Sequence, residues 1–426
     1  MKKITAVITI IYTVVQLNAQ NTITNQNFGV EITGFVKNDV FYDTRQNVSA
    51  REGHFLLWPS AEMIDENGQD INARSSLNML AIQSRLSCKI TGPDALNAKT
   101  SGVIEGDFFS QANDNINLLR LRHAYIKLNW EKTEVLTGQT WNPLFVTGCF
   151  PGTVSFNTGT PLQSFARNPQ IRITHRMGRI SIIGAALAQR DYVTAGPSGN
   201  SSEYLRNAVL PDMHLQLQYN TKNEASGINF LAGAGMAFKA VVPRLYNTIT
   251  DSLGSHNYRV DEKVNGLTSI AYFNLKIPVL TIKMQYRYGE NISDILSVSG
   301  FAVKNIVDAT TGELSYTPLK NTTFWGEVHT NGKEFQFGIF GGILINNGTK
   351  EKMSSTLNTV YGLTTNIESL YRIAPRIIYN SGKFRAAFEL EYTSADYGND
   401  YNLNYIPNSV KTVANIRALF STYYFF

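Results

Sequence analysis

Hydrophobic and polar residues alternate with a period of two along most of the chain. Within residues 384–393, for example, Phe384 and Phe388 fall on one side of the alternation, and Arg385 and Glu389 fall on the other. A period of two is the signature of a β-strand whose two faces meet different surroundings. The pattern therefore predicts an all-β protein built from amphipathic strands.

Counting each alternating segment between turn signals gives sixteen predicted strands. The segment at 133–140 and the early part of 118–130 alternate less regularly than the others. The predicted spans are 29–43, 76–91, 98–109, 118–130, 133–140, 169–177, 179–190, 211–220, 227–240, 264–277, 279–289, 319–330, 333–346, 367–380, 382–396 and 411–426.

The connections between these strands alternate between short and long. Asn331-Gly332 and Ser381-Gly382 supply the backbone freedom that tight hairpins need. Short turns on one side and long loops on the other are typical of a transmembrane antiparallel β-barrel, whereas a β-sandwich has no reason to separate loops by length. We therefore predict one barrel with no domain boundary, in which the long loops are 44–75, 110–117, 141–168, 191–210, 241–263, 290–318, 347–366 and 397–410.

The composition agrees with a barrel in a membrane. Aromatic residues make up 11% of the chain and charged residues only 17%, against roughly 25% charged residues in soluble domains. Aromatic side chains on the outward face near the short turns would form an interfacial girdle. The residues expected there are Tyr219, Phe230, Phe273, Phe335, Tyr379, Phe384, Tyr424 and Phe426.

The two ends of the chain point to the bacterial outer membrane. Residues 1–19 have a short basic start, an apolar stretch and a small residue, Ala19, before a predicted signal-peptide cut; a buried N-terminal strand is the alternative. The mature barrel would then span 20–426. The last strand ends on Phe426, an aromatic terminus of the kind read by the barrel-assembly machinery, and its outward face would contact lipid. Cys88 and Cys149 do not make a disulfide framework, and their pairing is left open.

A sixteen-stranded barrel leaves a water-filled interior, so the inward side chains decide which solutes pass. More inward positions are basic than acidic, and rings of arginine and lysine favour anions. Each arginine has an alternative role, pairing with a carboxylate across the wall. The predicted pore-lining cations are Arg85, Arg120, Arg122, Arg167, Arg172, Arg176, Lys283, Arg287, Arg372, Arg376 and Arg385, with Arg417 as a further candidate; the acidic candidates are Glu31, Asp39, Glu105, Asp107, Glu327, Glu389 and Glu391.

The long loop at 141–168 differs in composition from an ordinary surface loop. It contains Phe145, Phe150, Phe156 and Phe165 but no Asp, Glu or Lys, and its one charged residue is Arg167. We predict that it folds into the barrel and narrows the pore, with Arg167 facing the passing solute. An adhesive surface loop is the alternative.

Catalytic or cofactor-dependent functions find little support in the sequence. The six histidines are scattered and lack the partners of a catalytic or metal site. The sequence thus predicts no enzyme, no cofactor, no metal and no nucleic-acid partner. The function it favours is passive diffusion of small hydrophilic solutes, and an adhesin or structural barrel with a plugged lumen is the second candidate.

Three short motifs resemble the DcaP-type outer-membrane porins, a group related more loosely to the phosphate-selective porins. They are Gln-Thr-Trp-Asn-Pro-Leu-Phe at 139–145, Phe-Pro-Gly-Thr at 150–153 and Arg-Asn-Pro-Gln at 167–170. The resemblance implies a sixteen-stranded channel, commonly a homotrimer, for small anionic solutes such as dicarboxylates. The stretch at 51–59 is similar to Bacteroidota versions. Because only residues 20–28 precede the first strand, we expect no long N-terminal coiled coil of the kind found in some members.

Overall fold

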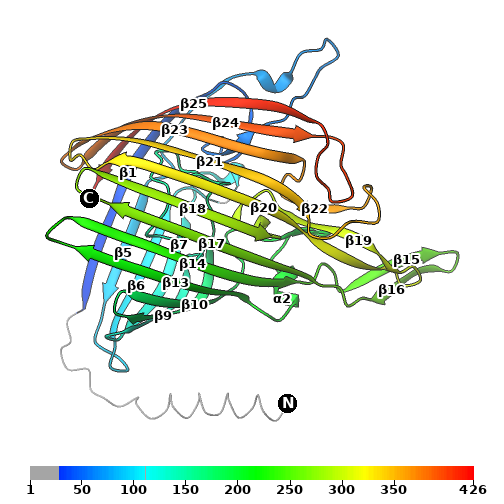
Figure 1. The fold of residues 1–426 in the computed structure, drawn as a ribbon, viewed down its shortest axis with the longest axis horizontal. Coiled ribbons are helices and arrows are strands. Elements are labelled where there is room, and N and C mark those ends of the chain that lie inside the picture. The colour runs from blue at the N-terminus through cyan, green and yellow to red at the C-terminus, as the bar shows by residue number, and fades with distance from the viewer. Residues whose placement is uncertain (1–27, 111) are drawn as a thin grey trace.

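The computed structural model describes residues 28–110 and 112–426, which form a closed antiparallel barrel (Figure 1). Sixteen strand positions follow one another around the wall, each paired with its neighbours in sequence. In order they are β1 (Gly29–Asp43), β4 with β5 (Ser76–Leu80 and Arg85–Thr91), β6 (Lys99–Asp107), β7 (Arg120–Asn129), β8 (Thr133–Trp141), β9 (Arg167–Met177), β10 (Ile180–Leu187), β13 (Asp212–Asn223), β14 (Ile228–Val241), β17 (Val264–Lys276), β18 (Leu280–Glu290), β20 (Glu313–Thr330), β21 (Phe335–Thr349), β23 (Ile367–Ser381), β24 (Phe384–Gly398) and β25 (Val410–Phe425).

The first and last strands close the barrel. β1 pairs with β25 in an antiparallel register that places Val40 opposite Phe420. The backbone of Phe426 exchanges hydrogen bonds of 3.2 and 3.3 Å with Gly34. A Cβ at position 34 would lie 2.2 Å from the Arg85 carbonyl oxygen of β5 and 2.7 Å from a carbon of the Phe426 ring. Glycine at this position therefore lets the terminal aromatic residue seat against β1.

The strands turn their apolar side chains outward and their polar side chains inward. In β23, Ile373, Ile377 and Tyr379 are exposed, whereas Arg372 and Arg376 are buried. This arrangement is the reverse of a soluble sheet and suits a wall with hydrocarbon outside. Closure also pairs the backbone of the edge strands, as an apolar solvent requires.

The connections between strands separate by length, as predicted. The tight hairpins and the C-terminus lie at one end, and the long connections lie at the other (Figure 1). The long connections hold the elements β2 (Asn47–Ala50), β3 (Phe55–Pro59), η1 (Ile71–Ala73), η2 (Asn113–Asn115), β11 (Ala195–Gly196), β12 (Gly199–Asn200), α2 (Glu203–Asn207), β15 (Tyr246–Asp251), β16 (Gly254–Arg259), η3 (Ser293–Ile295), β19 (Gly300–Asp308) and β22 (Val360–Gly362). Among the described residues, no helix has the length and apolar character needed to cross a membrane.

The sixteen predicted strands are confirmed; most of their ends shift by no more than three residues, and two strands differ further. The predicted strand 76–91 is broken into β4 and β5 because residues 81–84 bulge out of the ladder with β1. The Ser84 hydroxyl takes the place of a backbone partner there, accepting a hydrogen bond of 3.0 Å from the Lys37 amide. β20 begins at Glu313 rather than near 319, because its first residues pair with β19 beyond the barrel wall.

The predicted outward aromatic residues lie on the outer face near the short turns. Phe335 and Tyr379, on neighbouring strands, are 50% and 39% exposed, and their ring centroids are 4.9 Å apart. Phe230 and Phe273 are less exposed than the other six. The predicted signal peptide and its cut after Ala19 lie outside the described residues.

The main hydrophobic cluster lies inside the barrel rather than in a sheet-on-sheet core. It combines Phe55 and Trp58 from the first long loop with Phe156 and Phe165 from the third, and with Ile295 from the loop after β18. Several long connections therefore turn inward and pack on one another between the strands.

Candidate functional site

The third long loop leaves the wall after β8 and returns at the start of β9. Its two ends are held together by a hydrogen bond of 3.0 Å from the Asn142 amide to the Ala166 carbonyl. Directly after Trp141 the chain turns so that the Phe145 ring stacks on the indole, with centroids 3.9 Å apart. The loop thus begins with an aromatic stack rather than an exposed coil.

Buried carboxylates on the opposite wall accept the amide protons of this loop. The backbone amides of Val154 and Ser155 donate to the two oxygens of Glu389, at 2.7 and 3.0 Å. The Asn157 side chain donates to Glu391 at 2.8 Å, and Glu327 accepts from the backbone of the same loop. These glutamates lie on the inward faces of β24 and β20, so the loop lies against the inside of the wall.

Inward cations bind the carbonyl oxygens of the same loop. Arg372 donates to the Thr160 carbonyl at 2.7 Å, and Lys283 donates to the Phe150 carbonyl at 3.0 Å. A loop without Asp, Glu or Lys is suited to this position, because the wall already supplies both charges. That the loop narrows the pore stays a prediction.

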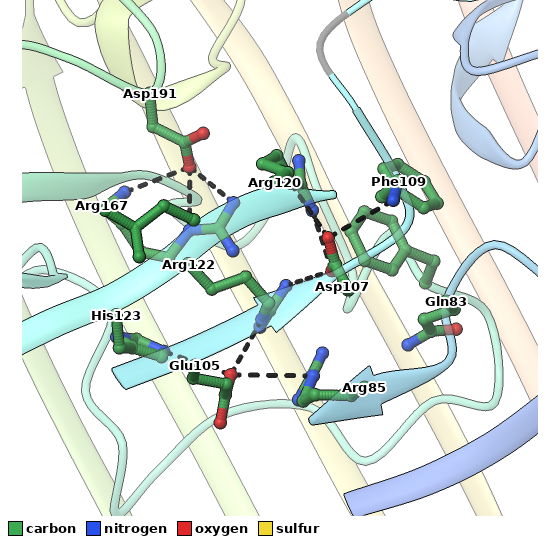
Figure 2. A network of polar contacts seen from close by, with 12 residues as sticks. Gln83, Arg85, Glu105, Asp107, Phe109, Arg120, Arg122, His123, Arg167 and Asp191 are labelled. Carbon is green, nitrogen blue, oxygen red and sulfur yellow. Dashed lines mark hydrogen bonds and ion pairs between the residues drawn. The ribbon is translucent and has the colours of Figure 1, made fainter. Parts of the chain in front are cut away.

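A network of arginines and carboxylates covers the wall formed by β5, β6 and β7 (Figure 2). Arg120 binds both oxygens of Asp107, at 3.0 and 2.9 Å. Arg122 lies between two acids, 2.8 Å from Glu105 and 2.9 Å from Asp107, and Arg85 approaches Glu105 at 3.6 Å. Bidentate and shared contacts of this kind fix the guanidinium planes and compensate their charges.

Arg167, the one charge predicted for the pore loop, is buried and paired. Its guanidinium donates to Asp191 at 2.9 and 2.6 Å, and the pair lies beside the network of Figure 2. Although burial alone would raise the pKa of Asp191, the Arg167 guanidinium holds that pKa below its usual value. Sequence reasoning missed Asp191, because its place inside the barrel depends on how a long loop folds.

Most of the other predicted cations also have a carboxylate partner. Lys283 and Arg376 share Glu327, at 3.4 and 3.0 Å, and Arg372 lies 3.5 Å from Glu391. For these residues the structure follows the pairing alternative. Arg176 makes a longer, more exposed pair with Glu134, at 3.8 Å. Two members differ: Arg385 binds Asn380 at 2.8 Å, and Arg287 is fully buried against Ser164, Pro161 and Ser297.

Arg172 makes no hydrogen bond and no ion pair within 4.0 Å in residues 28–110 and 112–426, although Glu134 of β8 is close enough to attract its charge. It lies on the inward face of β9, between the exposed Ile171 and Ile173. It lines a cavity of about 470 Å³ between the start of the third loop and the wall made by β13, β14 and β17. Lys222 is the second cation of this lining, which contains no carboxylate.

A second inward segment, residues 51–59 of the first long loop, was not predicted. Arg372 donates to the Leu57 carbonyl at 2.6 Å, and Arg417 donates to the Gly53 carbonyl at 2.7 Å. The ring of Phe55 packs 5.1 Å from that of Phe165 in the third loop. The apolar run at 55–59 is the signal that could have revealed it, since the same property singled out the third loop.

The two cysteines are separate in the structure. Cys88 and Cys149 are both free thiols. The Cys149 thiol donates to the Phe273 carbonyl at 3.1 Å, and burial raises the pKa of this thiol to about 12. Cys149 thus contributes to the attachment of the third loop to β17.

Comparisons with known proteins agree with the geometry. The family model described as DcaP outer membrane protein matches residues 16–203. A comparison with curated proteins finds no match. The outer membrane channel DcaP of Acinetobacter baumannii has a similar structure, with a TM-score of 0.66 and 16% identity over 94% of this chain and 98% of that chain.

A second group of similar structures comes from Vibrio cholerae. The outer membrane protein OmpT, folded in vitro, has a TM-score of 0.53 and 9% identity over 96% of this chain and all of that chain. A form of OmpT described as a trimer has a TM-score of 0.50 and 8% identity, over 94% and 99%. The relation to phosphate-selective porins and the Bacteroidota assignment stay predictions. The resemblance to the DcaP-type porins is confirmed over residues 16–203, and the chain has the fold of a porin-type outer-membrane β-barrel.

Proposed function

We propose that the protein is a porin through which small hydrophilic solutes diffuse, with a preference for anions such as small carboxylates. The observation that carries this proposal is the cavity beside the third loop, whose lining holds Arg172 and Lys222 but no carboxylate. Fixed positive charge in a narrow passage raises the local concentration of anions and repels cations. The A. baumannii protein of similar fold is described as an outer membrane channel. A homotrimeric assembly, which the family resemblance implies, stays a prediction.

The paired arginines contribute less to this preference than their number indicates. Arg120, Arg122 and Arg167 each face a carboxylate within 3.0 Å, so their fields are largely compensated at a distance. Lys222 also has an acidic neighbour, since Glu224 lies 3.1 Å away, although both groups are exposed at the barrel end. We therefore assign the larger share of the anion preference to Arg172.

One observation favours the second candidate, a barrel with a plugged lumen. Segment 51–59 and the third loop pack together inside the wall, and the rings of Phe55 and Phe156 meet edge to face with centroids 5.2 Å apart. A barrel blocked by such a cluster would serve in adhesion or as a structural element of the membrane, and would pass no current.

The zero-current potential across a planar bilayer under a KCl gradient distinguishes an anion-preferring porin from a plugged barrel. We expect the unmodified protein to conduct and to give a potential on the anion side. The substitution Arg172→Gln should move that potential toward zero. The effect should weaken with salt, because the screening length falls from about 10 Å at 0.1 M to about 3 Å at 1 M.

The matched control is Arg179→Gln, which removes the same charge from the tight turn that follows β9. Arg179 contacts the outward-facing Tyr219 at 3.4 Å, so its loss should leave the potential unchanged. A potential on the cation side in the unmodified protein would overturn the anion preference. The absence of current from correctly inserted protein would support the plugged barrel instead.

A further inference from the structure

The cavity beside the third loop has a lining rich in side-chain amides. Five amide side chains accompany the two cations in a space of about 470 Å³, within the range of roughly 300–1,000 Å³ that small-molecule sites occupy. The five are Gln216, Gln218, Asn220, Asn229 and Asn274.

Three of these amides project from one face of β13. Gln216, Gln218 and Asn220 alternate with Leu217 and Tyr219, which are exposed on the outer face. The register of the sheet sets the amides in a row along the inner wall, from the third loop toward the short-turn end. The row is therefore a fixed part of the wall rather than a chance meeting of loops.

Glycines on the neighbouring strand leave room for these long side chains. Gly235 and Gly233 of β14 lie opposite Gln216 and Gln218 in the register. A Cβ at Gly235 would lie 2.4 Å from the Gln216 side chain, and one at Gly233 would lie 2.4 Å from the Tyr272 hydroxyl. Larger residues would displace Gln216 and Tyr272, so the glycines help to shape the cavity.

The hydrogen bonds of the amides leave both acceptors and donors free. Gln216 donates to the Pro143 carbonyl at 2.8 Å, and Asn274 donates to the Gly148 carbonyl at 2.9 Å. Both amides thus use a donor to attach the third loop. Asn274 Oδ1 is buried and has no partner among the described residues. Gln218 is oriented the other way: its oxygen accepts from the Tyr272 hydroxyl at 3.2 Å, which leaves its NH₂ group available.

This combination selects against a simple carboxylate. Amide oxygens require a donor, and an ionised carboxylate has none. A hydroxyl group both donates and accepts, so it can pair with the Gln216 oxygen and with the Gln218 NH₂ group, which have no hydrogen-bond partner among the described residues. Leaving a buried acceptor unpaired is costly, and sites built for a hydroxyl discriminate strongly against analogues that lack it.

We propose that the cavity binds hydroxylated organic acids of the sugar-acid class, with the carboxylate near Arg172 and the hydroxyls along the amide row. The proposal rests on the proposed function, since it names the solute class for the same passage. It requires one charge and several hydroxyls in the same ligand, because the lining offers one unpaired arginine and a row of amides.

Three probes of similar carbon skeleton separate charge from hydroxylation. Gluconate has one carboxylate and five hydroxyls, hexanoate has the carboxylate alone, and sorbitol has hydroxyls alone. Isothermal titration calorimetry of the full protein in detergent should show gluconate binding more tightly than either of the others, by about tenfold or more. If hexanoate bound as tightly as gluconate, the site would recognise charge alone. If sorbitol bound as tightly as gluconate, Arg172 would have no role. Either result overturns the proposal, as does the absence of binding by all three probes.

Variants test the assignment to this cavity. Gln218→Met preserves the length of the side chain and removes its donors, and should lower the affinity for gluconate about tenfold while leaving that for hexanoate unchanged. Asn229→Leu is a second variant on a different strand, since Asn229 of β14 also lines the cavity. Gln336→Met is the control, because Gln336 lies on β21 outside the cavity lining and donates to Gly332 of its own turn. Unchanged gluconate binding in both cavity variants, with heat-modifiability showing that they fold, would overturn the proposal.

The outcome can be distinguished from failure of the porin proposal. Conductance in KCl alone tests the channel, whereas calorimetry tests the site. A conducting protein without preference for gluconate would contradict only the ligand class. A non-conducting protein that still binds gluconate would contradict only the proposal that the protein is a porin.

Discussion

At the scale of single residues, the partners of each inward charge decide what that charge does. Arg167 is fully buried against Asp191, whereas Arg172 lines a cavity without an acid. The two are five residues apart on the same strand and had the same predicted role. Their difference comes from Asp191, which a long loop places beside one arginine and not beside the other.

The substitution Asp191→Asn should destabilise the barrel because it leaves the Arg167 guanidinium buried without its counter-charge. Losing one partner of a buried pair costs about 3–5 kcal/mol. The change in the free energy of unfolding is measured by unfolding the protein with guanidinium chloride in detergent, with heat-modifiability reporting the folded fraction. The control Asp251→Asn, at an exposed pair with His256, should cost less than about 1 kcal/mol. Equal effects of the two substitutions would show that the Arg167–Asp191 pair does not support the fold.

At the scale of elements, the strands were predictable and the inward loops were only partly so. The side chains of a strand such as β24 face lipid and water in turn, so the strand can be recognised from its own residues. The break between β4 and β5 depends instead on how Ser84 meets Lys37 on β1. The loop at 142–166 was singled out by its phenylalanines, but its anchors, Glu389 and Glu391, are far away in sequence and could not be assigned to it.

Removing residues 148–164 in frame should raise the single-channel conductance, because this segment occupies the inside of the wall between β18 and β24. Glu389 and Glu391 would then lose their contacts with Val154 and Asn157 and face water. Removing 248–257 from the exposed ribbon of β15 and β16 is the control and should leave conductance unchanged. A conductance equal to or below that of the unmodified protein, in a barrel that still folds, would contradict a constricting role.

The last strand carries a prediction about assembly. Phe426 closes the ladder with Gly34 and packs its ring where that glycine leaves space. Deleting Phe426, or the change Phe426→Asp, should lower the amount of heat-modifiable protein in the outer-membrane fraction. The exchange Phe384→Leu, at another outward aromatic of the short-turn end, should have little effect. Unchanged amounts after the loss of Phe426 would remove the reason to regard this end as an assembly signal.

At the scale of the whole molecule, a closed barrel was predicted from the alternation of short and long connections. The sequence was also sufficient to predict sixteen strands. The filling of the lumen was not predictable to the same degree. Segment 51–59 meets the third loop only after both have folded inward. Its position depends on Arg372 and Arg417, from strands near the other end of the chain. The free space that remains beside the third loop is what the proposed function needs.

The central claim is that small hydrophilic solutes pass through this lumen despite the inward loops. Osmotic swelling of liposomes containing the purified protein, in an isotonic solution of a small neutral sugar such as arabinose, tests it most directly. We expect swelling faster than in protein-free liposomes, and slower uptake as the solute approaches the size of a disaccharide. Swelling equal to that of protein-free liposomes, from protein that is inserted and heat-modifiable, would contradict the account.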